Sequence, residues 1–217
     1  MPKVVPEYKE VAKSKIVQAA QVVFAKKGYH DATMDDVAKE LGVSKGALYS
    51  YFTSKEDLLK EISLQGHQTL RNILSATSEC NSLEAAITQV YTTITEKYKG
   101  NLHTHFEVIS LASHDAKIRD IVFEEYQKDI EAIEAFVEEK KKKGVIRTDL
   151  SAGLLAELFT SLYLGMAAKL LIGYPNEEVH DQWIKSMALI LGKQKVGKAA
   201  PKLGGTNEVG RIPNLTQ

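Results

Sequence analysis

Apolar residues recur at spacings of three and four along most of this chain. Such spacing places the apolar side chains on one face of an α-helix, whose period is 3.6 residues. Residues 7–174 contain no proline, the residue that most disrupts a helix interior. The pattern therefore predicts an all-α protein. Two of the apolar stripes are Ile16, Ala19, Ala20, Val23 and Phe24, and Leu83, Ile87, Val90, Tyr91, Ile94 and Tyr98.

Glycines and capping residues divide this pattern into about nine segments. Gly28 and Gly144 are typical of helix C-termini, and Gly173 followed by Pro175 marks another break. The lysines at 140–143 suit the negative end of a helix dipole, and a nucleic-acid patch is the alternative interpretation. The predicted helices are 9–27, 34–41, 45–51, 55–76, 82–99, 102–113, 116–143, 150–172 and 177–191.

Charge and composition narrow the class of protein. The 28 basic and 28 acidic residues balance, so any nucleic-acid contact depends on local placement of charge. Cys80 is the single cysteine, which excludes an intrachain disulfide and fits a reducing compartment. The N-terminus lacks the pattern of a signal peptide, and the apolar stretch 162–172 is too short for a membrane span and contains Lys169. We expect a cytoplasmic protein that does not enter a membrane and that ends in a flexible basic tail, residues 193–217.

Residues 33–59 carry the local signals of two short helices joined by a tight turn. Thr33 with Asp36 forms a capping-box pattern, and Ser44 suits the N-cap of the following helix. Gly42 permits the left-handed backbone of the turn, and we expect Val43 to fill the gap between the helices. Two short helices joined by a three-residue turn form a helix-turn-helix, whose second helix enters the major groove of DNA.

The same segment closely resembles the TetR family of bacterial and archaeal regulators. The resemblance covers about residues 10–62, and it implies a helix-turn-helix DNA-binding domain over 9–62, with the motif at about 33–52. It further implies a helical ligand-binding and dimerisation domain over 63–192. A member of this family is expected to be a homodimeric repressor on near-palindromic, double-stranded operator DNA. The residues that carry the resemblance are Gly42-Val43-Ser44-Lys45-Gly46, Leu48-Tyr49, Tyr51-Phe52, Ser54-Lys55-Glu56-Asp57-Leu58, Phe24-Ala25-Lys26-Lys27-Gly28-Tyr29 and Thr33.

The resemblance also implies which residues contact DNA. Hydroxyls at helix N-termini suit phosphate, a small Gly–Ala pair lets the recognition helix approach the groove, and lysine adds positive charge. Leu48 and Phe52 are expected in the core. The first arginine is Arg71, so the predicted domain lacks the side chain that most often reads guanine. Methyl contacts, Lys45 and DNA shape are then the expected sources of specificity. The implied DNA contacts are Thr33, Ser44, Lys45, Gly46, Ala47, Tyr49, Tyr51 and Lys55.

The last two predicted helices are strongly apolar. In the resembled family the final helix pair forms a four-helix dimer interface, and this pattern suits that use, with intrachain core as the alternative. The family also implies a pocket for a small hydrophobic or amphipathic effector. Aromatic walls with a few polar tips suit such ligands, although ordinary core packing explains the same residues. The candidate ligand contacts are Tyr91, Tyr98, Phe106, Tyr126 and Tyr163.

Signals of catalysis are weak. The chain has no glycine-rich phosphate loop and no Gly-x-Ser-x-Gly elbow. Glu177 and His180 form a single Glu-x-x-His unit, whereas a di-iron bundle needs two. We therefore expect no enzyme activity, no cofactor and no metal site. A TetR-like protein that binds DNA without an inducer, and a helical enzyme or carrier for a hydrophobic metabolite, are the alternatives.

Overall fold

The computed structural model describes residues 6–77, 82–97 and 100–192, and these residues form nine helices and no strand. The predicted all-α fold is confirmed, and each predicted helix is present with ends that differ by three residues or fewer. Tyr98 and the predicted tail, 193–217, lie outside the described residues. The helices are α1 (Pro6–Lys27), α2 (Met34–Leu41), α3 (Lys45–Tyr49), α4 (Lys55–Ala76), α5 (Leu83–Lys97), α6 (Leu102–Leu111), α7 (Ala116–Lys142), α8 (Ala152–Leu171) and α9 (Asn176–Ile190).

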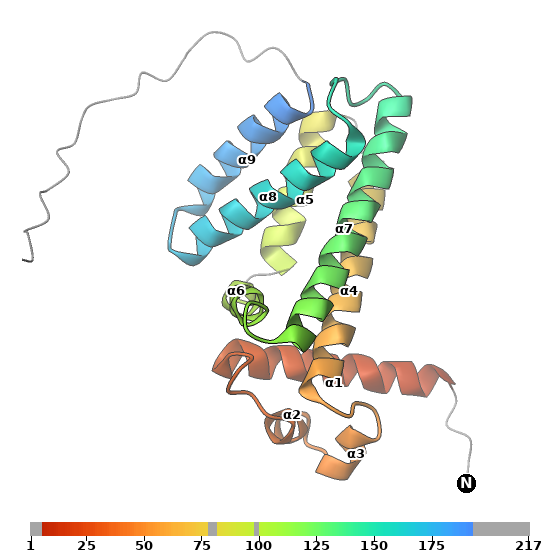
Figure 1. Ribbon diagram of the computed structural model, residues 1–217, viewed down its shortest axis with the longest axis vertical. Coiled ribbons are helices and arrows are strands. Elements are labelled where there is room, and N and C mark those ends of the chain that lie inside the picture. Colours follow the sequence, from red (N-terminus) through yellow and green to blue (C-terminus); the bar gives the residue numbers. More distant parts are fainter. Residues whose placement is uncertain (1–5, 78–81, 98–99, 193–217) are drawn as a thin grey trace, which may run out of the picture.

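The helices form a small head and a larger body (Figure 1). In the head, α1 lies across the end of the long helices α4 and α7, with α2 and α3 on its far side. In the body, α7 packs against both α4 and α8, and α9 packs against α5 and α8. Helix α6 contacts α1 of the head as well as α7 and α8 of the body. Helices α4 and α6 therefore both connect the head to the body.

Two hydrophobic clusters support this arrangement. The head cluster is built around Phe24, Val37 and Leu48, and it also takes in Val108 of α6 and Ile118 of α7. The body cluster has the buried Trp183 among its members. Helix α4 contributes to both clusters, with Leu58 and Leu59 in the first and Ile73 and Leu74 in the second. The predicted domain boundary at residue 62 thus falls inside a helix whose two ends belong to different cores.

Short-range capping fixes the head helices where the sequence predicts. The hydroxyl of Thr33 accepts from the amide of Asp36 (3.2 Å), and the hydroxyl of Ser44 accepts from the amide of Ala47 (3.2 Å). Gly42 ends α2 with φ 73°, the left-handed conformation expected for the turn. Val43 differs from its prediction: it is 40% exposed and does not fill the gap between the helices. The buried Leu48 of α3 lies in the head core instead.

Helix α8 has 20 residues and, by length and composition alone, is apolar enough to cross a membrane. The apolar stretch 162–172, which is too short for a membrane span, is shorter than the helix that forms. Core helices of water-soluble proteins pass the same test, and Leu155 and Ala156 of α8 are buried in the body core. The length of α8 is therefore weak evidence for a membrane span.

Candidate functional site: a DNA-binding surface and the body cavities

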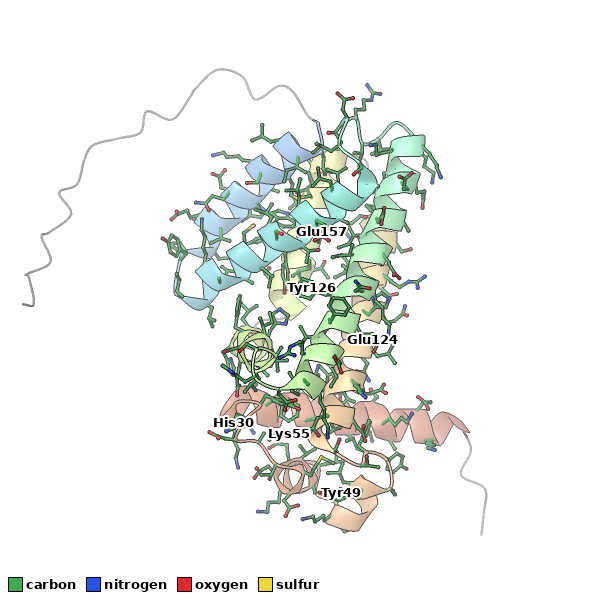
Figure 2. All side chains as sticks on the ribbon, viewed as in Figure 1. His30, Tyr49, Lys55, Glu124, Tyr126 and Glu157 are labelled. Carbon is green, nitrogen blue, oxygen red and sulfur yellow. The ribbon has the colours of Figure 1, made fainter. Side chains whose placement is uncertain are left out.

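Helix α3 presents small and polar side chains at the outer end of the head. Ser44 accepts the Ala47 amide as N-cap, while Lys45, Gly46 and Ala47 are exposed. Tyr49 is 40% exposed, and Figure 2 shows it at the outer end of the head, remote from the body. The structure thus brings these five predicted DNA contacts together on one surface, which we call the α3 surface.

Every acidic side chain of α2 is paired with a lysine. These pairs link α2 to α1 and α3, and they compensate carboxylates that would otherwise repel phosphate near the α3 surface. The pairs are exposed, so each contributes little to stability and can exchange its partner. They are Lys26 with Glu40 (3.1 Å), Lys27 with Asp36 (2.6 Å) and Lys45 with Asp35 (2.7 Å).

The start of α2 is already occupied by internal hydrogen bonds. Hydrogen bonds from Lys27 and from Thr33 hold the pKa of Asp36 at about 2, so this carboxylate is charged at neutral pH. The Thr33 hydroxyl donates to Asp36 (2.7 Å) while accepting from its amide. A phosphate contact through this hydroxyl therefore requires Thr33 to release Asp36.

Tyr51 and Lys55 occupy positions different from the exposed residues of α3. Tyr51 is half-buried against the head core. The ammonium of Lys55 donates to the carbonyls of Tyr29 (2.7 Å), His30 (2.9 Å) and Ala32 (3.0 Å), and it lies 4.6 Å from the centre of the Tyr29 ring. Figure 2 shows Lys55 beside His30, close to α1. Burial lowers the pKa of Lys55. All three donors of this ammonium are engaged by the α1–α2 loop, an arrangement that the sequence analysis did not predict.

A side chain of the body binds backbone amides of the same loop. The carboxylate of Glu107, on α6, accepts from the amides of Tyr29 and His30, both at 2.7 Å. Gly28 has φ 80°, and a Cβ atom at this position would lie 2.9 Å from Glu107, so glycine suits both the turn and the close approach.

Two further side chains of α6 bind the end of α1. Nε2 of His103 donates to the carbonyl of Ala25 (2.9 Å), and the hydroxyl of Thr104 donates to that of Phe24 (3.2 Å). Both carbonyls belong to the last turn of α1, and that of Phe24 also accepts from the amide of Gly28 (2.8 Å). We call His103, Thr104 and Glu107 the α6 latch, because together they fix the head to a helix of the body.

The larger of the two body cavities described here has a volume of about 600 Å³, and we call it the largest cavity. It lies between α4, α5, α7, α8 and α9, and the loop at 144–147 also lines it. Most of its wall is apolar, but Thr77 and Lys140 are also part of it, and Arg147 lines its solvent-exposed edge. Its lining includes Ile87, Val90, Ile133, Phe136, Leu155, Phe159, Trp183 and Met187.

A second cavity, of about 90 Å³, shares Ile133 and Phe159 with the first and lies nearer the head. Its polar residues include Glu125 and Asp129, and burial raises the pKa of each carboxyl. The hydroxyl of Ser63 donates to Glu125 (2.9 Å), and His67 contacts Asp129 at 2.8 Å.

His105, on the same helix as the α6 latch, also lines this smaller cavity. Its Nε2 is buried without a hydrogen-bond partner among the described residues, and burial lowers its pKa. The described residues contain no cluster of histidine, cysteine and carboxylate side chains suited to a metal ion.

Two of the predicted ligand contacts line the smaller of these cavities, and the other described ones line neither. Tyr126 and Tyr163 line the 90 Å³ cavity. Tyr91 is buried, and its hydroxyl donates to the side chain of Asn176 (2.8 Å). Phe106 is half-buried with its ring against His105. These four are absent from the lining of the largest cavity, whose aromatic residues are Phe136, Phe159 and Trp183.

The sequence analysis missed Lys140, Glu107 and Trp183 as candidate functional residues. Lys140 was hidden in the lysine run 140–143, where one of four similar residues turns inward. Glu107 contacts residues 77 and 78 positions away, and no local pattern marks such a pairing. Trp183 was assigned to the apolar face of the last helix, and it does lie in the body core, on the wall of the largest cavity.

Comparison with known proteins agrees with this geometry. The family described as "Bacterial regulatory proteins, tetR family" matches residues 16–62, which span most of the head. The chain is 27% identical to the HTH-type transcriptional regulator YfiR of Bacillus subtilis over 184 residues, 83% of this chain and 89% of YfiR. The structure of Salmonella enterica GusR superposes with a TM-score of 0.73 at 19% identity and covers 87% of this chain and 98% of GusR.

A further solved structure with the same fold contains a ligand. FadR from Bacillus subtilis, in complex with stearoyl-CoA, superposes with a TM-score of 0.63 at 18% identity, and the match covers 80% of this chain and 96% of FadR. At such identities these two structures indicate a shared fold.

Proposed function

The chain belongs to the TetR family of DNA-binding transcriptional regulators, and we propose that it is a homodimeric repressor which a small hydrophobic or amphipathic effector releases from its operator. The observation that carries this proposal is the juxtaposition of the exposed α3 surface with a body that encloses a cavity of about 600 Å³. We place the repressor in the cytoplasm, where its operator is accessible.

The α3 surface supports DNA recognition by geometry. A short helix with an exposed Gly46 and Ala47 can approach the floor of the major groove without a bulky side chain in the way. Lys45 can exchange Asp35 for a phosphate or a base edge, and the Tyr49 hydroxyl can donate to a phosphate. Lys55 donates to three carbonyls of the α1–α2 loop. We therefore propose that it stabilises this loop and that it is not a primary phosphate contact.

Dimerisation is supported by apolar surface on the last two helices and the turn between them. Leu154, Leu171, Ile172 and Leu189 are all exposed, and Leu189 is 74% exposed. Such side chains gain stability when a second copy of the same surface covers them. A two-fold dimer would set two α3 helices about 34–36 Å apart, one turn of DNA, and so would require a near-palindromic operator.

Two connections can carry a signal from the cavity to the head. Helix α4 runs from the head core to Leu74, which lines the largest cavity, so its tilt can move α3. The α6 latch is the second connection, because it binds the backbone of the α1–α2 loop directly. FadR of Bacillus subtilis, which has the same fold, binds stearoyl-CoA, and this supports an amphipathic effector for the present protein.

The effector needs different affinities for the two head positions. A coupling free energy of about 1–3 kcal/mol changes operator affinity roughly 5–150-fold, and the operator must then weaken effector binding by the same factor. A TetR-like protein that binds DNA without an inducer would lack this reciprocal effect.

A mobility-shift assay on the DNA upstream of the chain's own gene tests the DNA-binding part of the proposal. We expect Ala47→Glu to abolish the shift, because the new carboxylate faces phosphate and base edges on an exposed surface. Ala135→Glu places the same charge on an exposed position of α7 and should bind as the unaltered protein does. Equal binding by all three proteins would show that α3 does not read the DNA.

A further inference from the structure

We propose that the 600 Å³ cavity binds an anionic amphiphile, whose acid group is held by Lys140 and Arg147 and whose apolar tail lies toward Ile133 and Phe159. This inference rests on the proposed function, since it specifies the chemical class of the effector. It is carried by the placement of charge in the cavity wall.

The two least exposed polar side chains among the described residues line the largest cavity. Among the described residues, the buried polar or charged side chains are Thr77, 5% exposed, and Lys140, 8% exposed, and both line the cavity. A buried ammonium is costly unless anionic or polar groups compensate it. Lys140 lies 3.8 Å from the carboxylate of Glu139 and 5.1 Å from the centre of the Phe136 ring. An incoming acid group would add a charge-assisted hydrogen bond to these contacts.

The charged side chains among the described residues that line this cavity have one sign. Its described lining contains two charged side chains, those of Lys140 and Arg147, and no carboxylate. Arg147 is exposed and lines the cavity, and its Nε donates to the carbonyl of Gly144 (2.9 Å). A buried cation and a cation at the edge define a site for an acid group at this end of the cavity.

The rest of the cavity fits an apolar tail. Its volume lies within the range of about 300–1,000 Å³ that is usual for small-molecule sites. The wall between Lys140 and the smaller cavity is formed by Ile133, Phe136 and Phe159. A tail that extends along this wall leaves the acid group beside Lys140.

The smaller cavity would select the opposite charge. It contains Glu125 and Asp129, so a ligand with a cationic head would bind there in preference to the lysine end. Because the two cavities share Ile133 and Phe159, ligands with the same tail and different heads can distinguish between them.

The experiment compares dodecanoate, dodecan-1-ol and dodecylammonium, each below its micelle concentration, on the full chain at pH 7.5. Binding is followed by the fluorescence of Trp183, the single tryptophan, which lies in the cavity wall. We expect dodecanoate to bind about tenfold or more tightly than dodecan-1-ol, the size of effect given by one charge-assisted hydrogen bond in a desolvated site. Tighter binding of dodecylammonium, equal binding of acid and alcohol, or no binding of any of the three would overturn the proposal.

Variants identify the cation. Lys140→Met should remove most of the preference for dodecanoate and leave the affinity for dodecan-1-ol unchanged. Lys140→Arg should retain the preference. Arg147→Gln should reduce the preference less than Lys140→Met does. Lys142→Gln removes an exposed lysine from the last turn of α7 and should change nothing. If Lys140→Met weakens all ligands equally, Lys140 has only a structural role. If dodecanoate shows the predicted preference but does not release operator DNA, the site assignment stands and the effector role in the proposed function fails.

Discussion

The polar side chains that we assign to binding are exposed in the head, whereas in the body they include a buried lysine. In the head, Ser44, Lys45 and Tyr49 project from an exposed helix, while Leu48 of the same helix is buried. In the body, Thr77 and Lys140 are buried at a cavity wall, and Leu189 is 74% exposed. A long charged polymer can be read only by an outer surface, whereas a small ligand gains affinity from enclosure. The difference indicates that the two regions bind partners of different size.

The two regions also differ in how their important residues are fixed. The caps of the head join residues three apart, as in Thr33 with Asp36 and Ser44 with Ala47. The contacts between the head and the body are long-range, as in Glu107 with Tyr29. Local contacts keep the α3 surface in shape, and long-range contacts determine where that surface points.

The largest effect is expected when the exposed apolar surface of α9 is disrupted. Leu189→Asp places a charge in the proposed dimer contact and should produce a monomer. The monomer should bind the operator about 100-fold or more weakly, because it contacts one half-site and the dimer contacts two. Sedimentation at micromolar concentration and fluorescence anisotropy measure the two effects. Phe123→Asp changes another exposed apolar residue, on α7, and should leave the dimer intact. A monomeric unaltered protein would remove the basis for a two-fold operator.

Two lysines of the head are expected to separate DNA binding from stability. Lys55→Met removes the donor to three carbonyls and should lower the free energy of unfolding by about 1–3 kcal/mol. Lys45→Met should leave stability unchanged, because its pair with Asp35 is exposed, and should reduce the salt dependence of operator binding by about one counterion per subunit. Urea unfolding and anisotropy at several salt concentrations test both. The assignment of the two lysines is reversed if Lys55→Met changes only the salt dependence.

The smallest predicted effect concerns Glu125 of the smaller cavity. Burial raises the pKa of the Glu125 carboxyl. In the unfolded chain a glutamate ionises above about pH 4.3, whereas in the folded protein Glu125 stays protonated up to its raised pKa. The stability of the folded protein therefore falls as the pH rises from about 4.3 to the raised pKa. Glu125→Gln keeps an acceptor for Ser63 and removes this loss of stability. We expect its melting temperature to exceed that of the unaltered protein at pH 7.5 by about 2–4 °C for each kcal/mol gained.

The pH dependence of this difference is its control. Below about pH 4 both proteins carry a neutral side chain at position 125, so their melting temperatures should converge. The neighbouring His67 and Asp129 are in contact with each other and are present in both proteins, so they do not distinguish the two. A difference that is the same at both pH values would show that packing at residue 125, and not its charge, determines the effect.

The sequence predicted the fold well because its signals are local. Apolar periodicity gave all nine helices, and Thr33, Gly42 and Ser44 gave the turn and caps of the helix-turn-helix. The same reasoning did not find the role of Lys55, since its carbonyl partners lie 23 to 26 residues earlier and no spacing rule connects them. The largest cavity was also missed, because its wall combines residues from Leu74 to Gly192. Aromatic composition led instead to Tyr126 and Tyr163, which line the smaller cavity, and to Tyr91, which lines neither of the two.

The most direct test of the account is selection of binding sites from a library of random double-stranded DNA by the full chain. Recognition of the operator by a two-fold dimer predicts enrichment of an inverted repeat. The centres of its half-sites should lie about 10–10.5 base pairs apart, or a multiple of this spacing. Recognition by α3 also predicts that Ala47→Glu enriches no sequence, whereas Ala135→Glu enriches the same repeat. Selection of no inverted repeat by the unaltered protein, or of the same repeat by Ala47→Glu, would contradict recognition of a two-fold operator by α3.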